Sequence, residues 1–324
     1  MTIKLSKTNE LEKDAMSVTY FDTMMRLMEK NSDIMELEAD LGVCILGGGY
    51  KDMEKAHPKQ LINCGIQEAN MVGVACGLSA VGKIPFAHTF APFIARRAND
   101  QIFISGCYAG SNIRLVGSDP GVMAAFNGGT HMPFEDVAAL RAFPEITIIE
   151  PTDSAMLADL MEQLVDLKGV YYIRLARKNM NRVYEMGSSF TIGKGNVLRG
   201  GNDVTIVATG IMVADAIEAA KQLEAQGISA RVVDMFTIKP VDEELLVKCA
   251  KETGAIVTAE NHNVIGGLAG AVCEALSDKC PVIVEKVGVQ DTFGEVGPID
   301  FLKEKFHLTA ADIVEKAKLA VSKK

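Results

Sequence analysis

The stretch CGIQEANMVGVACGLSAVGKIPFAHTF, residues 64–90, reads as a helix followed by a strand. From Gln67 onward apolar residues recur at helical spacing, and PFAHTF at its end is short and apolar, as a buried strand is. One acid, Glu68, stands at the start of this otherwise apolar helix. Two interpretations are open. The positive end of the helix dipole stabilises a carboxylate in the first turn, or Glu68 is a partly buried acid whose surroundings allow it to hold or share a proton.

The same alternation of apolar runs and helical periodicity continues in both directions and predicts an α/β fold with a mostly parallel sheet. In the first half, helices are expected over residues 67–80, 92–106, 134–142 and 153–166, the last with Thr152, Asp153 and Ser154 in cap position. The expected strands there are IMELEA, PFAHTF, NIRLVG, ITIIEP and VYYIRLA.

The length of 324 residues favours two domains. From Lys178 to Asp203 the periodicity lapses into a passage rich in glycine and asparagine, after which strands and helices alternate again. We therefore predict a boundary near residue 190, with a larger domain over 1–190 and a smaller α/β domain over 191–324.

Composition excludes several classes of protein. The formal charge of -9 without a long run of like charge argues against a nucleic-acid partner. Seven cysteines without a CxxC pair predict reduced thiols. The polar N-terminus lacks the apolar core of a signal peptide, and no uncharged apolar run approaches about 18 residues. We expect a cytoplasmic protein that does not span a membrane.

The common local signatures of catalysis are missing from the sequence: GxGxxG after a strand, GxxxxGK[ST], GxSxG and HExxH. The five histidines are scattered along the chain, so no metal-ligand cluster is expected. The chemistry should therefore use neither a nucleophile nor a metal site of this chain.

Three further segments carry candidate site residues. TFAPFIARRANDQI places Phe90, Phe93 and Arg96 where they form either a slot for a flat ring or ordinary core contacts. NGGTHMPFED places His131 on a glycine-rich loop before a helix, a position suited to anionic substrates. RLARKN ends a strand with Arg174 and Arg177, which are either surface charges or phosphate ligands.

Taken in order, these blocks resemble the C-terminal half of transketolase and, more closely, the separate C-terminal subunit of two-chain transketolases. The resemblance covers nearly the whole chain. It includes ELEADLG (36–42), the stretch at 64–86, TFAPFIARRANDQI (89–102), GGTHMPFEDVAALRAFPEITIIEPTD (128–153), RLARKN (174–179), ENHNVIGGLAG (260–270) and DTFGEVGPIDFLKEKFHLTAADI (291–313). It implies a pyrimidine-binding domain followed by a transketolase C-terminal domain.

The resemblance also implies roles for individual residues. Glu68 would contact the ring nitrogen of the aminopyrimidine of thiamine diphosphate and stabilise its imino tautomer, and His131 would be the second catalytic group. The cofactor site would comprise Asp40, Glu68, Phe90, Phe93 and Arg96, and the substrate site Asp119, Asn127, His131 and Arg177. The diphosphate- and Mg²⁺-binding half is missing from the chain. The resemblance thus implies a partner subunit that holds most of the cofactor and the Mg²⁺, in a heterotetramer.

Departures from the family pattern concern the substrate. Asn127 stands where an acid normally reads a sugar hydroxyl, and Cys44 where a serine helps hold the acceptor phosphate. The arginine expected near the start falls among Met16, Ser17 and Val18. The substrate could therefore be a pentose phosphate, a sulfonate, another anionic sugar or a smaller one. A 2-oxoacid dehydrogenase beta subunit, deoxyxylulose phosphate synthase and a non-catalytic homologue remain alternatives.

Overall fold

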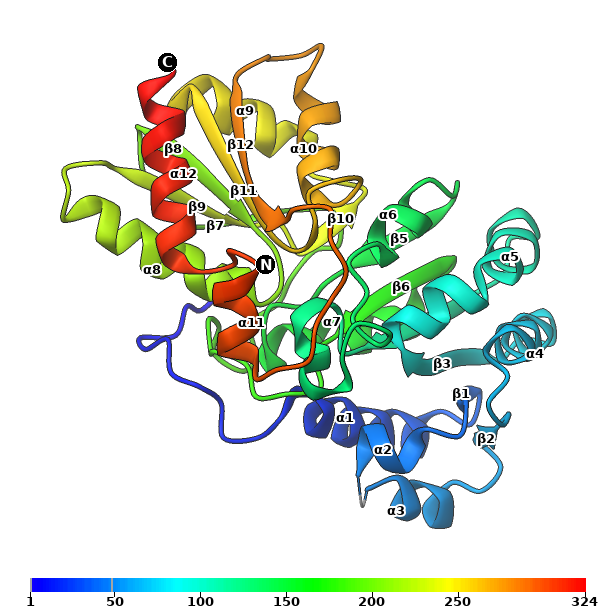
Figure 1. Ribbon diagram of the computed structural model, residues 1–324. Helices are drawn as coiled ribbons and strands as arrows, with labels where there is room; N and C mark the ends of the chain where they lie inside the picture. The colour runs from blue at the N-terminus through cyan, green and yellow to red at the C-terminus, as the bar shows by residue number, and fades with distance from the viewer. Residues whose placement is uncertain (1, 48) are drawn as a thin grey trace.

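The computed structural model describes residues 2–47 and 49–324, in which helices alternate with the strands of two sheets (Figure 1). The larger sheet has the strand order β10-β5-β6-β4-β3-β1-β2, and the smaller one β12-β11-β8-β9-β7. Among the described residues the strands pair in parallel, except β10 with β5 and β7 with β9. The predicted α/β class is confirmed.

The strands match the apolar runs of the sequence closely. Those of the larger sheet are β1 (Ile34–Glu38), β2 (Leu61–Asn63), β3 (Ile84–Phe90), β4 (Ile113–Ser118), β5 (Ile146–Ile149), β6 (Val170–Leu175) and β10 (Thr237–Lys239). Those of the smaller sheet are β7 (Asn196–Arg199), β8 (Val204–Ala208), β9 (Ala230–Asp234), β11 (Ala255–Asn263) and β12 (Ile283–Val289). The sequence patterns had not indicated the short strands β2, β7 and β10.

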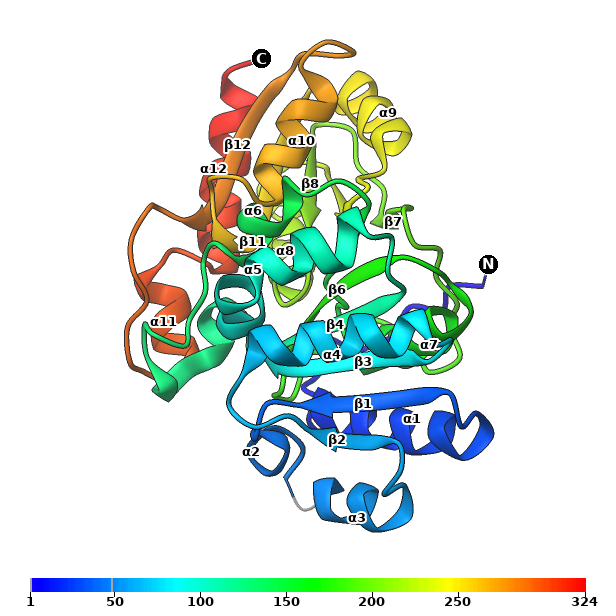
Figure 2. The same cartoon turned by 90° about the vertical axis from the view of Figure 1, so that its right-hand side faces the viewer.

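Helices cover both faces of the larger sheet, as Figure 2 shows. On one face α1 (Met16–Lys30) packs beside α7 (Ser154–Asp166), and side chains such as Tyr20 and Leu160 join one apolar core. On the other face α4 (Glu68–Ala80) and α6 (Asp136–Arg141) join a second core. The helices expected over 67–80 and 153–166 are confirmed, and Asp153 caps α7 by accepting a hydrogen bond from the amide of Met156.

The smaller sheet is built in the same way. One face packs against α8 (Met212–Glu224) and α12 (Ala310–Ser322), and the other against α9 (Glu243–Thr253) and α10 (Leu268–Leu276). Shorter helices include α2 (Gly42–Leu46), α3 (Gly49–Ala56) and α11 (Ile299–Lys305). No helix in the described part of the chain is long and apolar enough to cross a membrane.

The single helix expected over 92–106 is wrong in detail. Two π-helical turns, η1 (Phe93–Arg97) and η2 (Ile102–Tyr108), flank the short α5 (Asn99–Gln101). A π turn adds a residue to the helical repeat and shifts the side chains that follow it onto a different face. A regular period of 3.6 residues therefore could not predict which side chains of this segment lie at the candidate site described below.

The larger sheet crosses the predicted domain division. Its edge strand β10 comes from residues well beyond 190, and it pairs antiparallel with β5. The two halves are also joined by Arg174 of β6, which is fully buried and forms ion pairs with Asp136 and Glu150 at 2.8 Å. Arg174 also donates a hydrogen bond to the carbonyl of Asn261, in the second half. A boundary near residue 190 remains a prediction, and the sheets show that the halves share structure.

Candidate active site

The candidate residues gather at the carboxyl end of the larger sheet, where ligands bind in folds of this kind. Asp40 follows β1, Phe90 ends β3, and Asp119 follows β4. Asp40 and Asp119 have φ angles of 60° and 53°, so the chain turns sharply as it leaves these two strands. These turns hold both aspartates at the edge of the sheet.

Glu68 begins α4 and is only 3% exposed. Its Oε1 accepts a hydrogen bond of 2.8 Å from Nη1 of Arg97, and no other hydrogen bond to its carboxylate is found among the described residues. The Arg97 guanidinium lies 4.1 Å from the centre of the Phe93 ring. The buried acid is therefore held through one oxygen, beside an aromatic face.

Three rings gather beside Arg97, the partner of this acid, and form an aromatic cleft. The centres of the Phe90 and Phe93 rings are 5.9 Å apart, and His131 lies edge-on to both, at 5.7 and 5.0 Å. A hollow of about 400 Å³ opens there, lined by Pro92, Phe93, Arg96, Arg97, Thr130 and His131. Burial lowers the pKa of His131, and the cations of Arg97 and Arg96 lower it further, so the imidazole is neutral at neutral pH.

Asp119 and Arg177 form an ion pair beside the Phe90 ring. Nη2 of Arg177 lies 2.8 Å from Oδ2 of the fully buried Asp119, and Nε donates to the same oxygen at 2.9 Å. Arg177 also donates to the carbonyl of Cys44 and lies over the Phe90 ring at 5.3 Å. The guanidinium is thus already fixed, with part of its donor capacity in use. Arg174, the other arginine of its segment, is committed to the buried ion pairs.

The remaining candidates lie on the rim. Asn127 ends the 3₁₀ segment η3 (Gly121–Asn127) and is exposed, and its side chain makes no hydrogen bond to the described residues. Arg96 donates to the carbonyl of Thr130 at 2.8 Å, so it braces the loop that carries His131. Asp40 is exposed and accepts a hydrogen bond from Asn63.

Sequence reasoning missed Arg97, which contacts both Glu68 and the face of the Phe93 ring. The sequence had instead suggested Arg96 as the arginine beside these rings. Sequence reasoning also did not foresee that three side chains of metal-ligand type meet in the fold. Glu36, Glu38 and His88 are brought together on β1 and β3. Burial raises the pKa of both glutamates; it opposes protonation of His88, but the two carboxylates raise the pKa of that histidine to about 9. Part of this cluster was visible in the sequence, since Glu36 and Glu38 alternate along an otherwise apolar strand.

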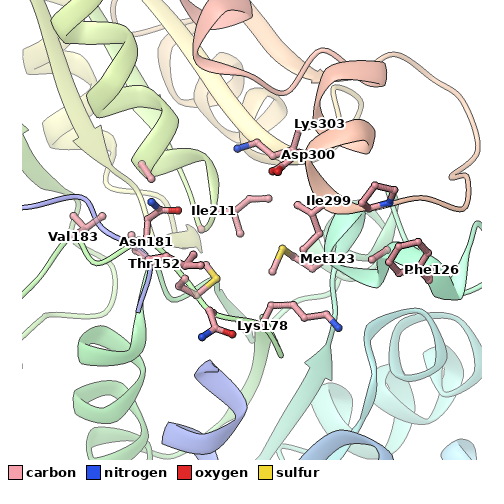
Figure 3. A pocket seen from close by; sticks show the side chains of 17 residues that line it. Met123, Phe126, Thr152, Lys178, Asn181, Val183, Ile211, Ile299, Asp300 and Lys303 are labelled. Atoms are coloured by element: carbon pink, nitrogen blue, oxygen red, sulfur yellow. The ribbon is translucent and has the colours of Figure 1, made fainter. Parts of the chain in front are cut away.

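Figure 3 shows a second cavity, of about 420 Å³, on which Met123, Phe126, Ile211 and Ile299 converge. Its polar side chains are largely engaged elsewhere in the fold. Lys303, for instance, forms an ion pair with Asp215 at 2.6 Å. This cavity lacks the buried acid and aromatic rings of the cleft.

Comparisons with known proteins assign both halves of the chain to one family. Residues 13–182 match the transketolase pyrimidine binding domain, and residues 193–313 the transketolase C-terminal domain. The chain is 48% identical over 308 residues to the 6-deoxy-6-sulfo-D-fructose transketolase subunit SqwH of Clostridium sp. (strain MSTE9), with 95% of each chain covered. It is 38% identical to an apulose-4-phosphate transketolase subunit of Phocaeicola vulgatus, covering 84% of this chain and 86% of that one.

Among solved structures, a split gene transketolase described as an inactive beta4 tetramer superposes with a TM-score of 0.87. It is 44% identical, and the match covers 96% of this chain and 99% of that one.

Proposed function

The chain belongs to the transketolase family, and we propose that it is the C-terminal subunit of a two-chain enzyme that moves a two-carbon ketol unit from a ketose to an aldose. The observation that carries this proposal is Glu68, a buried acid held by Arg97, which itself lines the aromatic cleft. The relatives described as single transketolase subunits are similar in length to this chain, which supports the two-chain arrangement.

Membership of the family implies thiamine diphosphate as cofactor, and the residues present fit its pyrimidine end. The rings of Phe90 and Phe93 offer apolar faces to a flat heterocycle, and Glu68 has one carboxylate oxygen not engaged by Arg97. When bound, thiamine diphosphate supplies the electron sink that allows a carbon–carbon bond next to a carbonyl to break.

The chain's own residues then have distinct tasks. Glu68 would hold a proton at the pyrimidine ring nitrogen, while Arg97 keeps its carboxylate in one orientation. The aromatic walls would exclude water from the reacting atoms. The neutral His131 can donate or accept a hydrogen bond at a substrate oxygen, and Asp40 would line the cofactor side of the cleft.

The substrate we propose is a ketose with a terminal anion, in the class of modified sugars to which sulfofructose belongs. The guanidinium of Arg177 lies over the Phe90 ring, held by Asp119, and Arg96 and Arg97 add positive charge where they line the hollow. A sulfonate or phosphate accepts charge-assisted hydrogen bonds from such groups. Asn127, exposed and without a partner among the described residues, would contact the sugar hydroxyls.

The proposed partner is a chain that binds the diphosphate and Mg²⁺, in a complex with two copies of each subunit. The outer face of α4 supports an interface, since Gly73 and Gly77 are exposed there and have no atom within 4 Å of an added Cβ. A helix with such a flat face can be approached closely by another backbone. Within this proposal the chain divides near residue 190.

Reconstitution tests the proposal. The chain, mixed with a diphosphate-binding partner subunit, thiamine diphosphate and Mg²⁺, should transfer the ketol unit, and neither chain alone should do so. A panel of ketoses with sulfonate, phosphate or no terminal anion then ranks the donors. Tight binding of thiamine diphosphate to this chain alone, measured by calorimetry, would contradict the shared site.

A further inference from the structure

A cluster of three side chains of types that can bind a metal lies inside the larger sheet, on β1 and β3. Glu36 and Glu38 alternate along β1 and so project from the same face of that strand, and His88 of β3 is the register partner of Glu38. All three side chains are fully buried. One ligand atom of each lies within 4.8 Å of the other two.

The ligand atoms of this cluster lack ordinary hydrogen-bond partners. Both carboxylate oxygens of Glu38, Oε1 of Glu36 and Nδ1 of His88 are buried and have none among the described residues. Nδ1 of His88 lies 3.4 Å from Oε1 of Glu36 and 3.2 Å from Oε1 of Glu38. Buried polar atoms are rarely left in this state unless something else fills the site.

The other atoms of these side chains are held by neighbours. Nε2 of His88 lies 2.5 Å from Oγ of Ser118, which leaves Nδ1 free to act as a ligand. The hydroxyl of Tyr20 donates to Oε2 of Glu36 at 2.8 Å. Such outer contacts orient the histidines and carboxylates that bind metals in proteins.

We propose that Glu36, Glu38 and His88 form a site for one divalent transition-metal ion, with Zn²⁺ the best fit. Tetrahedral ligands at about 2.0–2.2 Å from zinc lie roughly 3.3–3.6 Å apart, close to the two separations between His88 and the glutamates. A mixed set of imidazole and carboxylates suits zinc better than Mg²⁺, which favours oxygen ligands and retains water. The second oxygen of Glu38 can supply a fourth contact.

Charge supports the same occupant. Two carboxylates in a site without solvent need positive charge. Among the described residues a protonated His88 supplies one such charge to the pair, and no lysine or arginine forms an ion pair with either glutamate. A divalent ion with neutral histidine balances them fully. The alternative is protons shared among the three groups, and the experiment separates the two.

The ion would have a structural role close to the active site. Glu38 lies two residues before Asp40, His88 two residues before Phe90, and Ser118 directly before Asp119. One metal would therefore tie together the ends of β1, β3 and β4, where the cleft begins. This site belongs to this chain and is separate from the Mg²⁺ proposed for the partner subunit.

The test uses the full chain purified without its partner, so that no Mg²⁺ site of the partner contributes. Elemental analysis of wild type after dialysis should find about one zinc per chain. Chelation should lower its unfolding midpoint, and added Zn²⁺ should restore it. Glu38→Gln should lose the ion, whereas Glu260→Gln, which alters an equally buried glutamate of the smaller sheet, should retain it.

Two results would overturn the proposal. One is a wild-type chain that contains no zinc, iron, manganese or other divalent transition metal and whose unfolding midpoint responds to neither chelator nor Zn²⁺. That result would assign the cluster to shared protons. The other is a folded Glu38→Gln chain with undiminished metal content. If Glu38→Gln does not fold, calorimetric titration of chelated wild type with Zn²⁺ decides, and the absence of one-to-one binding refutes the site.

Discussion

Replacing Glu68 by Gln should separate the catalytic role of this acid from its role in the fold. The amide keeps the shape of the side chain and can still accept the hydrogen bond from Arg97, but it can no longer hold and release a proton. General acid–base groups contribute about 10²–10⁴-fold to rate, or roughly 3–5 kcal/mol at about 1.4 kcal/mol per factor of ten. We expect kcat of the reconstituted enzyme to fall by at least about 100-fold.

Stability should change little. Glu68 has a single partner, the half-exposed Arg97, and stands in the first turn of α4. Losing its charge there should cost about 1 kcal/mol or less, which shifts the unfolding midpoint of a chain of this size by only a few degrees. The assay is steady-state transfer with partner, cofactor and Mg²⁺, alongside thermal unfolding of the subunit.

Glu243→Gln is the matched control. Glu243 is likewise the first residue of a helix, α9, and forms an ion pair with Lys279 far from the cleft. It should lose similar stability and keep full activity. The reasoning about Glu68 fails if Glu68→Gln retains more than about a tenth of wild-type kcat, or if Glu243→Gln loses as much activity as Glu68→Gln does.

Three further predictions concern other groups. Arg177→Ala should raise the KM for sugars with a terminal anion by about one to two orders of magnitude, since a charge-assisted hydrogen bond is worth about 1.5–3 kcal/mol, and should leave the KM for uncharged sugars unchanged. Adding Asp119→Asn should restore the stability lost through the unpaired carboxylate without restoring the KM for anionic sugars. An equal rise in KM for both sugar classes would contradict the role of Arg177 in binding the anion. Arg97→Met should raise the pKa of His131, measured by NMR titration of the subunit, because a neighbouring cation is removed; an unchanged titration would contradict this. Burial raises the pKa of Asp234 to about 7, so the native state binds more protons than the unfolded chain between about pH 4 and 7, and stability falls as pH rises through this range. Asp234→Asn should flatten this part of the curve of unfolding midpoint against pH. A curve identical to that of wild type would refute the raised pKa of Asp234.

The sequence was sufficient for features that depend on local pattern. Helical spacing predicted a helix over 67–80, close to α4, with Glu68 near its start, and the apolar runs located the central strands. It was insufficient where residues distant in sequence meet. Nothing local links Glu36 to His88, which are brought together by the pairing of β1 with β3. Arg97 was missed because a π turn, not a regular helix, directs it to Glu68.

The position of β10 bears on how the chain acquires its structure during synthesis. The larger sheet has its first six strands by residue 175, but β5 remains an open edge until residues 237–239 emerge and pair with it. An open strand edge is a template for pairing with other chains. A fragment ending near residue 190 would therefore expose this edge permanently and associate with itself. In the full chain the last strand of the larger sheet is made only after three strands of the smaller one, β7, β8 and β9.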